Sequence, residues 1–290
     1  MTKALLILLA VLASTATLAA KGPSVAYRTA PSGAYFEYVP FGKLSGVLVL
    51  AHGSVEEENT QSDVRKVAES FIQRWTKLAD EHRLVVIAPV FDSAYGSWVG
   101  EKGISLGGYR GLEGKAIGAD EFVIGLVEQY RDRAPVDRFY LYGHSAGGQF
   151  ANRFAVRHPE RIKALVLSAP GRYAFPNASA PWPYGQKPVS VKRAGDAAAK
   201  MIMVDPDNWR KAAALPISIA VGGADTEPQP PRPDHPGKTR IDYAKAWVEA
   251  MTALSPDNGA RIKLTVVPRI PHSSAGLTPA CQAYLVEDLK

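Results

Sequence analysis

The sequence predicts an α/β protein: a doubly wound, mostly parallel sheet with a cap-like insert between two late strands. Three observations lead to this prediction. Short apolar runs rich in β-branched residues recur along the chain, and most are followed by a turn and a helical pattern. These runs are apolar on both faces, which is typical of central parallel strands covered by helices. The pentapeptide Gly-His-Ser-Ala-Gly at 143–147 lies between one such run and a helical stretch.

The sheet is expected to contain six central strands, at residues 47–51, 84–88, 139–142, 164–168, 217–221 and 262–267. An antiparallel strand near 34–39 would start the sheet. Helical patterns at 118–133, 148–158 and 240–254 match the crossover connections between parallel strands. The alternation of strand and helix predicts the doubly wound arrangement.

The first 20 residues have the pattern of a secretory signal peptide. Lys3 is followed by an apolar run at 4–13 and by a stretch of small residues at 14–20. The apolar run is well short of the ~20 residues that span a bilayer. We therefore expect export to the periplasm or the medium, no stable membrane insertion, and a mature α/β domain over 21–290.

Composition and motifs exclude several classes of function. Cys281 is the only cysteine, so an intrachain disulfide is impossible, and we expect its thiol to be buried near the last helix. The formal net charge is +6, but Lys and Arg are scattered and no nucleic-acid motif accompanies them. Asp234 and His235 form an isolated pair without metal-ligand spacing, and no phosphate loop or dinucleotide fingerprint occurs. We expect no metal, cofactor or nucleic-acid partner.

Residues 171–214 form a long insert, rich in proline and aromatic residues, between two expected strands. Connections of this length are usually functional. We expect the insert to stand over the carboxyl ends of the strands as a cap or pocket wall. Tyr173, Trp182 and Tyr184 would then form an aromatic wall for the substrate, although packing of the insert onto the domain explains them equally well. A second irregular segment, 227–238, is proline-rich and expected to be exposed.

Ser145, at the centre of the pentapeptide, is the expected nucleophile. A strand, a sharp turn and a helix form the geometry of a nucleophile elbow, which exposes the serine hydroxyl on a strained turn. Gly143 and Gly147 are needed because a Cβ at either place would collide across the turn.

A serine hydroxyl needs a base, and in this fold the acid and then the histidine follow at the ends of later strands. Asp225 comes just after the strand at 217–221, and His272 just after the strand at 262–267. We interpret Ser145, Asp225 and His272 as a triad. His272 would accept the serine proton, and Asp225 would fix the tautomer of His272. Two alternatives stay open: Glu227 or Asp234 as the acid, and His235 as the base.

The oxyanion of the reaction needs two preorganised N–H donors. The amide of Ala146, at the start of the elbow helix, is one expected donor. The amide of Ser54 is the other, because it follows His52 and Gly53 in the loop after the strand at 47–51. Ser54 could instead be only a turn residue.

These residues resemble the α/β-hydrolase superfamily, and in particular exported bacterial esterases of the polyhydroxybutyrate-depolymerase-like and feruloyl-esterase-like group. The similarity rests on short matches along the mature chain: His52-Gly53, Ala88-Pro89, Phe91-Asp92, the elbow through Phe150, His158-Pro159, Pro183-Tyr184-Gly185 and Asp225-Thr226. The resemblance implies a metal-independent serine hydrolase that cleaves a small-molecule or polymeric carboxylic ester. It also implies the same triad. Acyl transfer and amide or peptide hydrolysis use the same residues and stay open, as does, more remotely, a non-catalytic binding protein.

Overall fold

The computed structural model describes residues 22–54, 61–96, 107–193, 195–232, 234–255 and 261–289. The expected signal peptide at 1–20 lies outside these residues. No helix in the described ranges is both long and apolar enough to cross a membrane.

The centre of the molecule is an eight-stranded sheet with the order β1-β2-β4-β3-β5-β6-β9-β10. Its strands, in chain order, are β1 (Ala26–Ala30), β2 (Gly33–Tyr38), β3 (Gly46–Ala51), β4 (Leu84–Pro89), β5 (Phe139–His144), β6 (Ile162–Ser168), β9 (Ile217–Gly222) and β10 (Ile262–Val267). Only the pairs β1–β2 and β2–β4 are antiparallel. The pairs from β4 to β10 are parallel. The doubly wound, mostly parallel sheet with an antiparallel start is confirmed.

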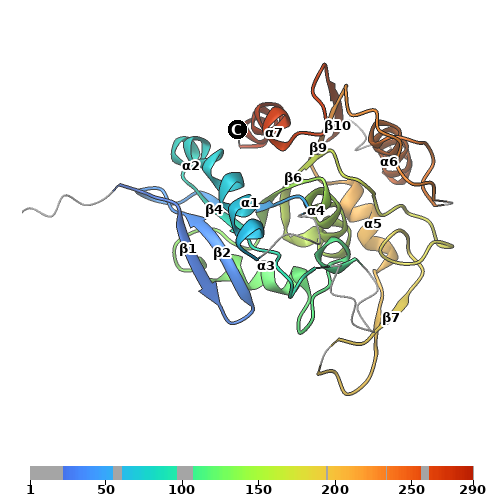
Figure 1. The fold of residues 1–290 in the computed structure, drawn as a ribbon, viewed down its shortest axis with the longest axis horizontal. Helices are drawn as coiled ribbons and strands as arrows, with labels where there is room; N and C mark the ends of the chain where they lie inside the picture. The colour runs from blue at the N-terminus through green and yellow to red at the C-terminus, as the bar shows by residue number, and fades with distance from the viewer. Residues whose placement is uncertain are drawn as a thin grey trace, which may run out of the picture.

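Helices cover both faces of the sheet (Figure 1). They are α1 (Gln61–Gln73), α2 (Thr76–His82), α3 (Ala119–Glu128), α4 (Ala146–Arg157), α5 (Pro206–Ala213), α6 (Arg240–Leu254) and α7 (Ser274–Asp288), with short 3₁₀ turns η1 (Gly108–Gly111) and η2 (Pro159–Arg161). The helix expected over 118–133 ends at Glu128, because the next residues form tight turns with Tyr130 N–H bonded to Val127 and Arg133 N–H to Tyr130.

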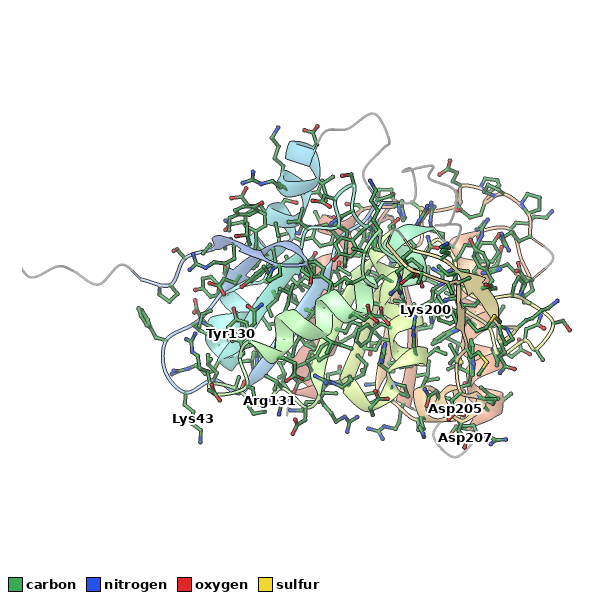
Figure 2. All side chains as sticks on the ribbon, turned by 90° about the horizontal axis from the view of Figure 1, so that it is seen from below. Lys43, Tyr130, Arg131, Lys200, Asp205 and Asp207 are labelled. Atoms are coloured by element: carbon green, nitrogen blue, oxygen red, sulfur yellow. The ribbon has the colours of Figure 1, made fainter. Side chains whose placement is uncertain are left out.

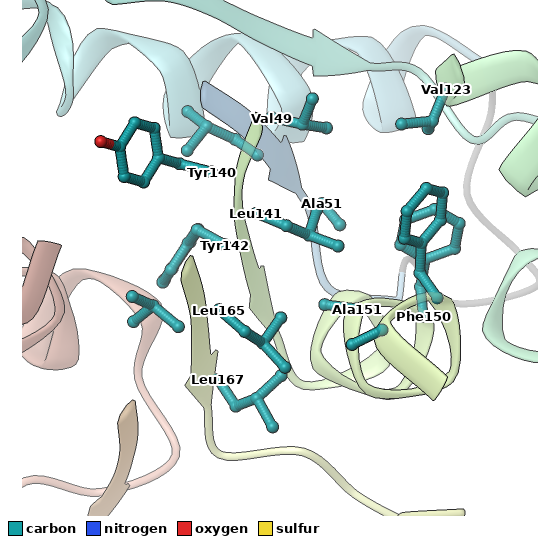
Figure 3. Packing of buried hydrophobic residues seen from close by; sticks show 14 of the residues in the cluster. Val49, Ala51, Val123, Tyr140, Leu141, Tyr142, Phe150, Ala151, Leu165 and Leu167 are labelled. Carbon is teal, nitrogen blue, oxygen red and sulfur yellow. The ribbon is translucent and has the colours of Figure 1, made fainter. Parts of the chain in front are cut away.

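The side chains of β5 alternate between the two helical layers, as a strand requires. Phe139 meets Phe154 of α4, with ring centroids 5.6 Å apart. Tyr142 points the other way, to Phe71 of α1 and to Trp75. Every residue of β5 is buried, so the strand that leads to the pentapeptide is rigidly held. Figure 3 shows Leu141 and neighbouring strand residues packed beside α4.

The insert 171–214 divides into two parts. Its first part includes a small antiparallel pair, β7 (Val189–Val191) and β8 (Lys200–Ile202). Its last part forms α5, which packs against α4 and α6 and belongs to the helical layer. Figure 2 shows Lys200 and Asp205 of the insert at the opposite end of the molecule from Lys43. Only the part before α5 is therefore available as a cap or pocket wall.

Cys281 lies on α7 and is fully buried, as expected. Burial raises the pKa of its thiol to about 12, which makes it an unreactive core residue.

Candidate active site

Ser145 occupies the sharp turn between β5 and α4. Its backbone has φ 53° and ψ −112°, a conformation that a residue with a side chain rarely adopts. A Cβ on Gly147 would lie 2.0 Å from the carbonyl oxygen of Ala51, and one on Gly143 would lie 2.1 Å from that of Gly147. Both glycines are therefore required by close backbone approach, as the elbow prediction stated.

The structure brings Ser145, His272 and Asp225 into one hydrogen-bonded chain. The hydroxyl of Ser145 lies 2.9 Å from Nε2 of His272. Nδ1 of the same ring lies 2.8 Å from Oδ2 of Asp225. With the proton on Nδ1, His272 donates to the carboxylate and presents a lone pair to the serine hydroxyl. This is the arrangement that activates a serine for attack.

The loops after β9 and β10 bring the acid and the base together. Backbone N–H groups of Gly223 and Ala224 donate to the carbonyls of Val267 and Ile270, at 2.7 and 3.0 Å. A Cβ on Gly222 would lie 2.1 Å from the Ile270 carbonyl, so the two loops approach as closely as glycine allows. Two parallel strands thus end in loops that are hydrogen-bonded to each other, and each loop contributes one side chain to the site.

Arg240, the first residue of α6, holds the second oxygen of the Asp225 carboxylate. Its Nη1 lies 2.6 Å from Oδ1, and the two side chains are 12% and 1% exposed. Both carboxylate oxygens of Asp225 therefore have a partner, as a buried charge requires. Sequence reasoning missed this contact, because nothing in the pattern near 240 indicates that the helix begins beside Asp225.

The alternative acid and base residues lie elsewhere. Glu227 is exposed. Asp234 pairs with Arg232 and His235 instead. Nε2 of His235 accepts the backbone N–H of Tyr173 at 3.2 Å, so this ring is occupied on both nitrogens. His235 is also buried, which corrects the expectation that the proline-rich segment 227–238 is exposed throughout.

The loop after β3 lies against the elbow, where an oxyanion donor is needed. A Cβ on Gly53 would lie 3.6 Å from the Cβ of Ser145. His52 anchors this loop, since its Nδ1 lies 2.7 Å from the Gly53 carbonyl and its Nε2 accepts the Phe91 N–H at 3.1 Å. Burial lowers the pKa of His52 to about 4, so the ring is a neutral brace at physiological pH. Ser54 follows, exposed, at the end of this described stretch.

Ala146 is the first residue of α4, and it is 2% exposed. Amides in the first turn of a helix have no intrahelical acceptor, and the helix dipole makes this end positive. The amide of Ala146 therefore has the environment of an oxyanion donor beside the Ser145 hydroxyl.

The three expected aromatic wall residues have different positions. Tyr173 is fully buried and stacks on Trp247, with ring centroids 5.3 Å apart. Trp182 is 2% exposed, and its indole N–H donates to Gly111. These two side chains pack the insert onto the core and do not form an open wall, which corrects the expectation for them. Tyr184 is half-buried and lines a pocket.

That pocket has a volume of about 230 Å³ and lies between the start of the insert, α4 and the proline-rich segment. Its described lining is polar and basic and consists of Gly107, Arg110, Gln149, Arg153, Gly171, Arg172, Pro183, Tyr184 and Gln229. Sequence reasoning did not identify this basic pocket, because its arginines come from separate segments. No cluster of His, Cys, Asp and Glu that could hold a metal ion occurs in the described ranges.

Comparisons with known proteins agree with this fold. A family model described as alpha/beta hydrolase fold matches residues 99–199. The solved structure of LpqC, a poly(3-hydroxybutyrate) depolymerase from Bordetella parapertussis, is similar with a TM-score of 0.65 and 22% identity, over 92% of this chain and 89% of that one. Poly(aspartic acid) hydrolase-1 from Sphingomonas sp. KT-1 gives a TM-score of 0.64 and 21% identity, over 90% and 97%.

Several curated proteins match this chain over short stretches. The Abhydrolase domain-containing protein abhd-5.2 of Caenorhabditis elegans is 36% identical over 52 residues, which are 18% of this chain and 12% of that protein. The (Lyso)-N-acylphosphatidylethanolamine lipase of Mus musculus is 34% identical over 59 residues, which are 20% and 17%. The matched stretch thus spans less than a fifth of either relative. Together with the sheet order and the elbow, the comparisons show that the chain has the α/β-hydrolase fold.

Proposed function

We propose that the protein is a serine hydrolase that cleaves carboxylic esters through an acyl-enzyme. The observation that carries this proposal is the chain of hydrogen bonds from Ser145 through His272 to Asp225, at 2.9 and 2.8 Å. Nucleophilic catalysis by a serine requires this arrangement: the nucleophile is hydrogen-bonded to a base, and a carboxylate orients the base.

In the proposed first half-reaction, Oγ of Ser145 attacks the ester carbonyl carbon as its proton passes to Nε2 of His272. The carbonyl oxygen becomes an oxyanion that accepts from the amides of Ala146 and Ser54. The tetrahedral intermediate then expels the alcohol, which takes the proton from His272. In the second half-reaction, water attacks the acyl-enzyme with the same proton transfers, releases the carboxylic acid and restores Ser145.

The test is hydrolysis of a p-nitrophenyl ester series, from acetate to long acyl chains, by the wild type and by Ser145→Ala in parallel. We expect activity in the wild type alone, and the preferred chain length would measure the acyl pocket. A serine-directed fluorophosphonate probe should label the wild type and not the variant. A folded wild type that neither cleaves an ester nor takes the label would contradict the proposal.

Amide hydrolysis is the second candidate, because the name of one structural neighbour says that it acts on poly(aspartic acid). The triad supports both reactions, since an amide differs from an ester at the leaving group. Matched ester and amide substrates with the same acyl group would separate the two. We propose the ester as the better substrate, and a higher kcat/KM for the amide would reverse that order.

We also propose that residues 1–20 direct export, from the basic, apolar and small-residue pattern of that segment. Mass spectrometry of the mature protein tests this. A protein that retains residues 1–20 and stays with the cytoplasmic fraction would contradict it.

A further inference from the structure

The basic pocket beside the elbow contains a buried positive charge that has no acidic partner among the described residues. Arg153 is only 1% exposed. Its Nε donates to the Pro183 carbonyl at 2.7 Å, and its Nη1 donates to the Arg110 carbonyl at 2.7 Å and to Oε1 of Gln149 at 3.2 Å. Its Nη2 is buried and has no hydrogen-bond partner in the part of the chain that the structure describes.

A buried cation of this kind is costly to the folded protein. Removing a guanidinium from water without a counter-charge is unfavourable, and carbonyl dipoles compensate for only part of that cost. The pKa of Arg153 is lowered to about 10, mainly by burial and also by the neighbouring arginines at 110, 172 and 232. The group is nevertheless charged at neutral pH, so its free Nη2 is a donor that lacks its acceptor.

Arg172 adds a second positive charge to the same pocket. Its guanidinium donates to the Gly171 carbonyl at 2.9 Å and to the Pro230 carbonyl, and it lies 4.7 Å from the ring centre of Tyr243. These contacts fix its position and leave its charge without a carboxylate among the described pocket residues. Arg232 differs, because Asp234 already neutralises it.

Two contacts connect the pocket to the candidate active site. Gln149 and Arg153 lie on α4 and follow Ser145 at intervals of four residues, and the Gln149 N–H donates to the Ser145 carbonyl at 3.0 Å. Gln229 also lines the pocket. With its amide oxygen turned toward Arg240, it accepts from both terminal nitrogens at 3.1 and 3.2 Å, and Arg240 holds Asp225.

From this geometry we propose that the pocket binds a carboxylate of the substrate, and that the preferred ester carries such a group on its acyl or alcohol part. The planar fork of a guanidinium matches a carboxylate, and an anion would satisfy the free Nη2 of Arg153. This inference rests on the proposed ester hydrolysis for its kinetic consequence, whereas anion binding itself does not depend on turnover.

The kinetic test compares esters that differ by one charge. Mono-4-nitrophenyl esters of six- to eight-carbon dicarboxylic acids are compared with the corresponding methyl 4-nitrophenyl diesters. The acetate ester of 4-hydroxybenzoic acid is compared with that of its methyl ester, which places the charge on the alcohol part. In at least one series we expect kcat/KM for the ester with a free carboxylate to exceed kcat/KM for its methyl-capped counterpart by about 10-fold or more. A ratio of this size corresponds to the free energy of one charge-assisted hydrogen bond.

Arg172→Gln and Arg153→Gln should bring that ratio down to about 1 or below. The matched control is Arg210→Gln, because Arg210 is 72% exposed on α5 and pairs with Asp207 outside the pocket. It should keep the wild-type ratio. A wild-type ratio of 1 or less in both series, or an unchanged ratio in Arg172→Gln, would overturn the proposal.

Thermal unfolding measures binding without turnover. A ligand that binds only the folded state raises Tm. The reference is the Tm of each protein in sodium chloride of equal ionic strength. We expect adipate to raise the Tm of the wild type and of Arg210→Gln above this reference. The Tm of Arg172→Gln should not rise. A shift with inorganic phosphate but not with adipate, or no shift with either, would overturn the carboxylate site. A shift with adipate in a protein that cleaves no ester would uphold the site and contradict the proposed function.

Discussion

The combination Arg–Asp–His occurs three times in the described part of the molecule, once as Arg157–Asp120–His158, and the other two differ in the geometry around the imidazole. In the first, Arg240 holds Asp225, which holds His272. In the second, the carboxylate of Asp234 accepts from Arg232 at 2.8 and 2.9 Å and meets Nδ1 of His235 at 3.1 Å. In both, an arginine and a histidine share one carboxylate.

The difference lies at the second ring nitrogen. Nε2 of His272 faces the Ser145 hydroxyl, and its side chain is 29% exposed. Nε2 of His235 accepts a backbone N–H, and its side chain is fully buried among the rings of Phe175, Tyr184 and Tyr243. An Asp–His pair can therefore act as a base only where the far nitrogen meets a group that can give up a proton. In the second combination the Asp–His pair instead attaches the proline-rich segment to the insert, through the Tyr173 N–H.

Removing the proposed nucleophile or the histidine of the first combination should have the largest effect. Ser145→Ala and His272→Ala each remove a group that forms or breaks a bond in every turnover, so we expect kcat to fall by about 10³–10⁶-fold. His235→Gln should keep most of the turnover, because that ring does not reach the serine. Steady-state kinetics on the best p-nitrophenyl ester measures all three. Equal losses in His272→Ala and His235→Gln would remove the distinction between the two combinations.

The next effect concerns the two carboxylates. Asp225→Asn replaces the acceptor of the His272 Nδ1 proton with an amide that favours the wrong tautomer, so kcat should fall by about 10⁴-fold or less. Asp234→Asn makes the same chemical change in the second combination and should act on stability instead. Kinetics and urea unfolding of both variants form the test, and a catalytic loss confined to Asp234→Asn would reverse the assignment.

The sequence was sufficient to predict that Ser145, Asp225 and His272 lie together, because each of them follows a strand of the same parallel sheet. Their order in the chain and the shared edge of the sheet are enough to predict that the three residues lie close together. The sequence distinguishes His272 from His235 less clearly, since both follow β9. A tertiary contact excludes His235 as the base, because its Nε2 accepts the backbone N–H of Tyr173, a residue of the insert.

The pocket could not be predicted in the same way. The sequence predicts Tyr173 and Trp182 as wall residues, but both are buried. An aromatic side chain in an irregular insert carries no pattern that distinguishes a core position from a surface one. Arg153 was visible in the sequence as a helix residue, but its free Nη2 depends on Pro183 and Arg110, both distant in sequence. Such contacts follow from tertiary packing and not from local periodicity.

The buried histidines should make stability depend on pH. Burial lowers the pKa of His235 to about 4, from an ordinary value of 6.5. The unfolded chain thus binds more protons between these values, so the contribution of His235 is complete above pH 6.5 and is lost as the pH falls toward 4. One such group accounts for about 2 kcal/mol between pH 6.5 and pH 5. His52 and His144, with pKa values lowered to about 4 and about 3 by burial, act in the same direction.

Urea unfolding at pH 7 and pH 5 tests this on the second combination. His235→Gln should be less stable than the wild type at pH 7, because its contacts with Asp234 and Tyr173 are lost. Its further loss on going to pH 5 should be smaller than that of the wild type by about 2 kcal/mol. The same loss with pH in both proteins would contradict the buried, neutral state of this ring.

The smallest effect should come from the two arginines, and it tests whether the combinations differ at every position. Arg240→Gln leaves Oδ1 of the buried Asp225 without its charged partner, so the carboxylate holds His272 less firmly and kcat should fall by about tenfold. Arg240→Lys, which keeps the charge, should recover part of that loss. Arg232→Gln breaks the corresponding pair with Asp234 and should lower the unfolding free energy without a comparable loss in kcat for an uncharged short-chain ester. If the two glutamine variants lowered kcat equally, the second combination would also take part in turnover, and the contrast between a catalytic and a structural Asp–His pair would fail.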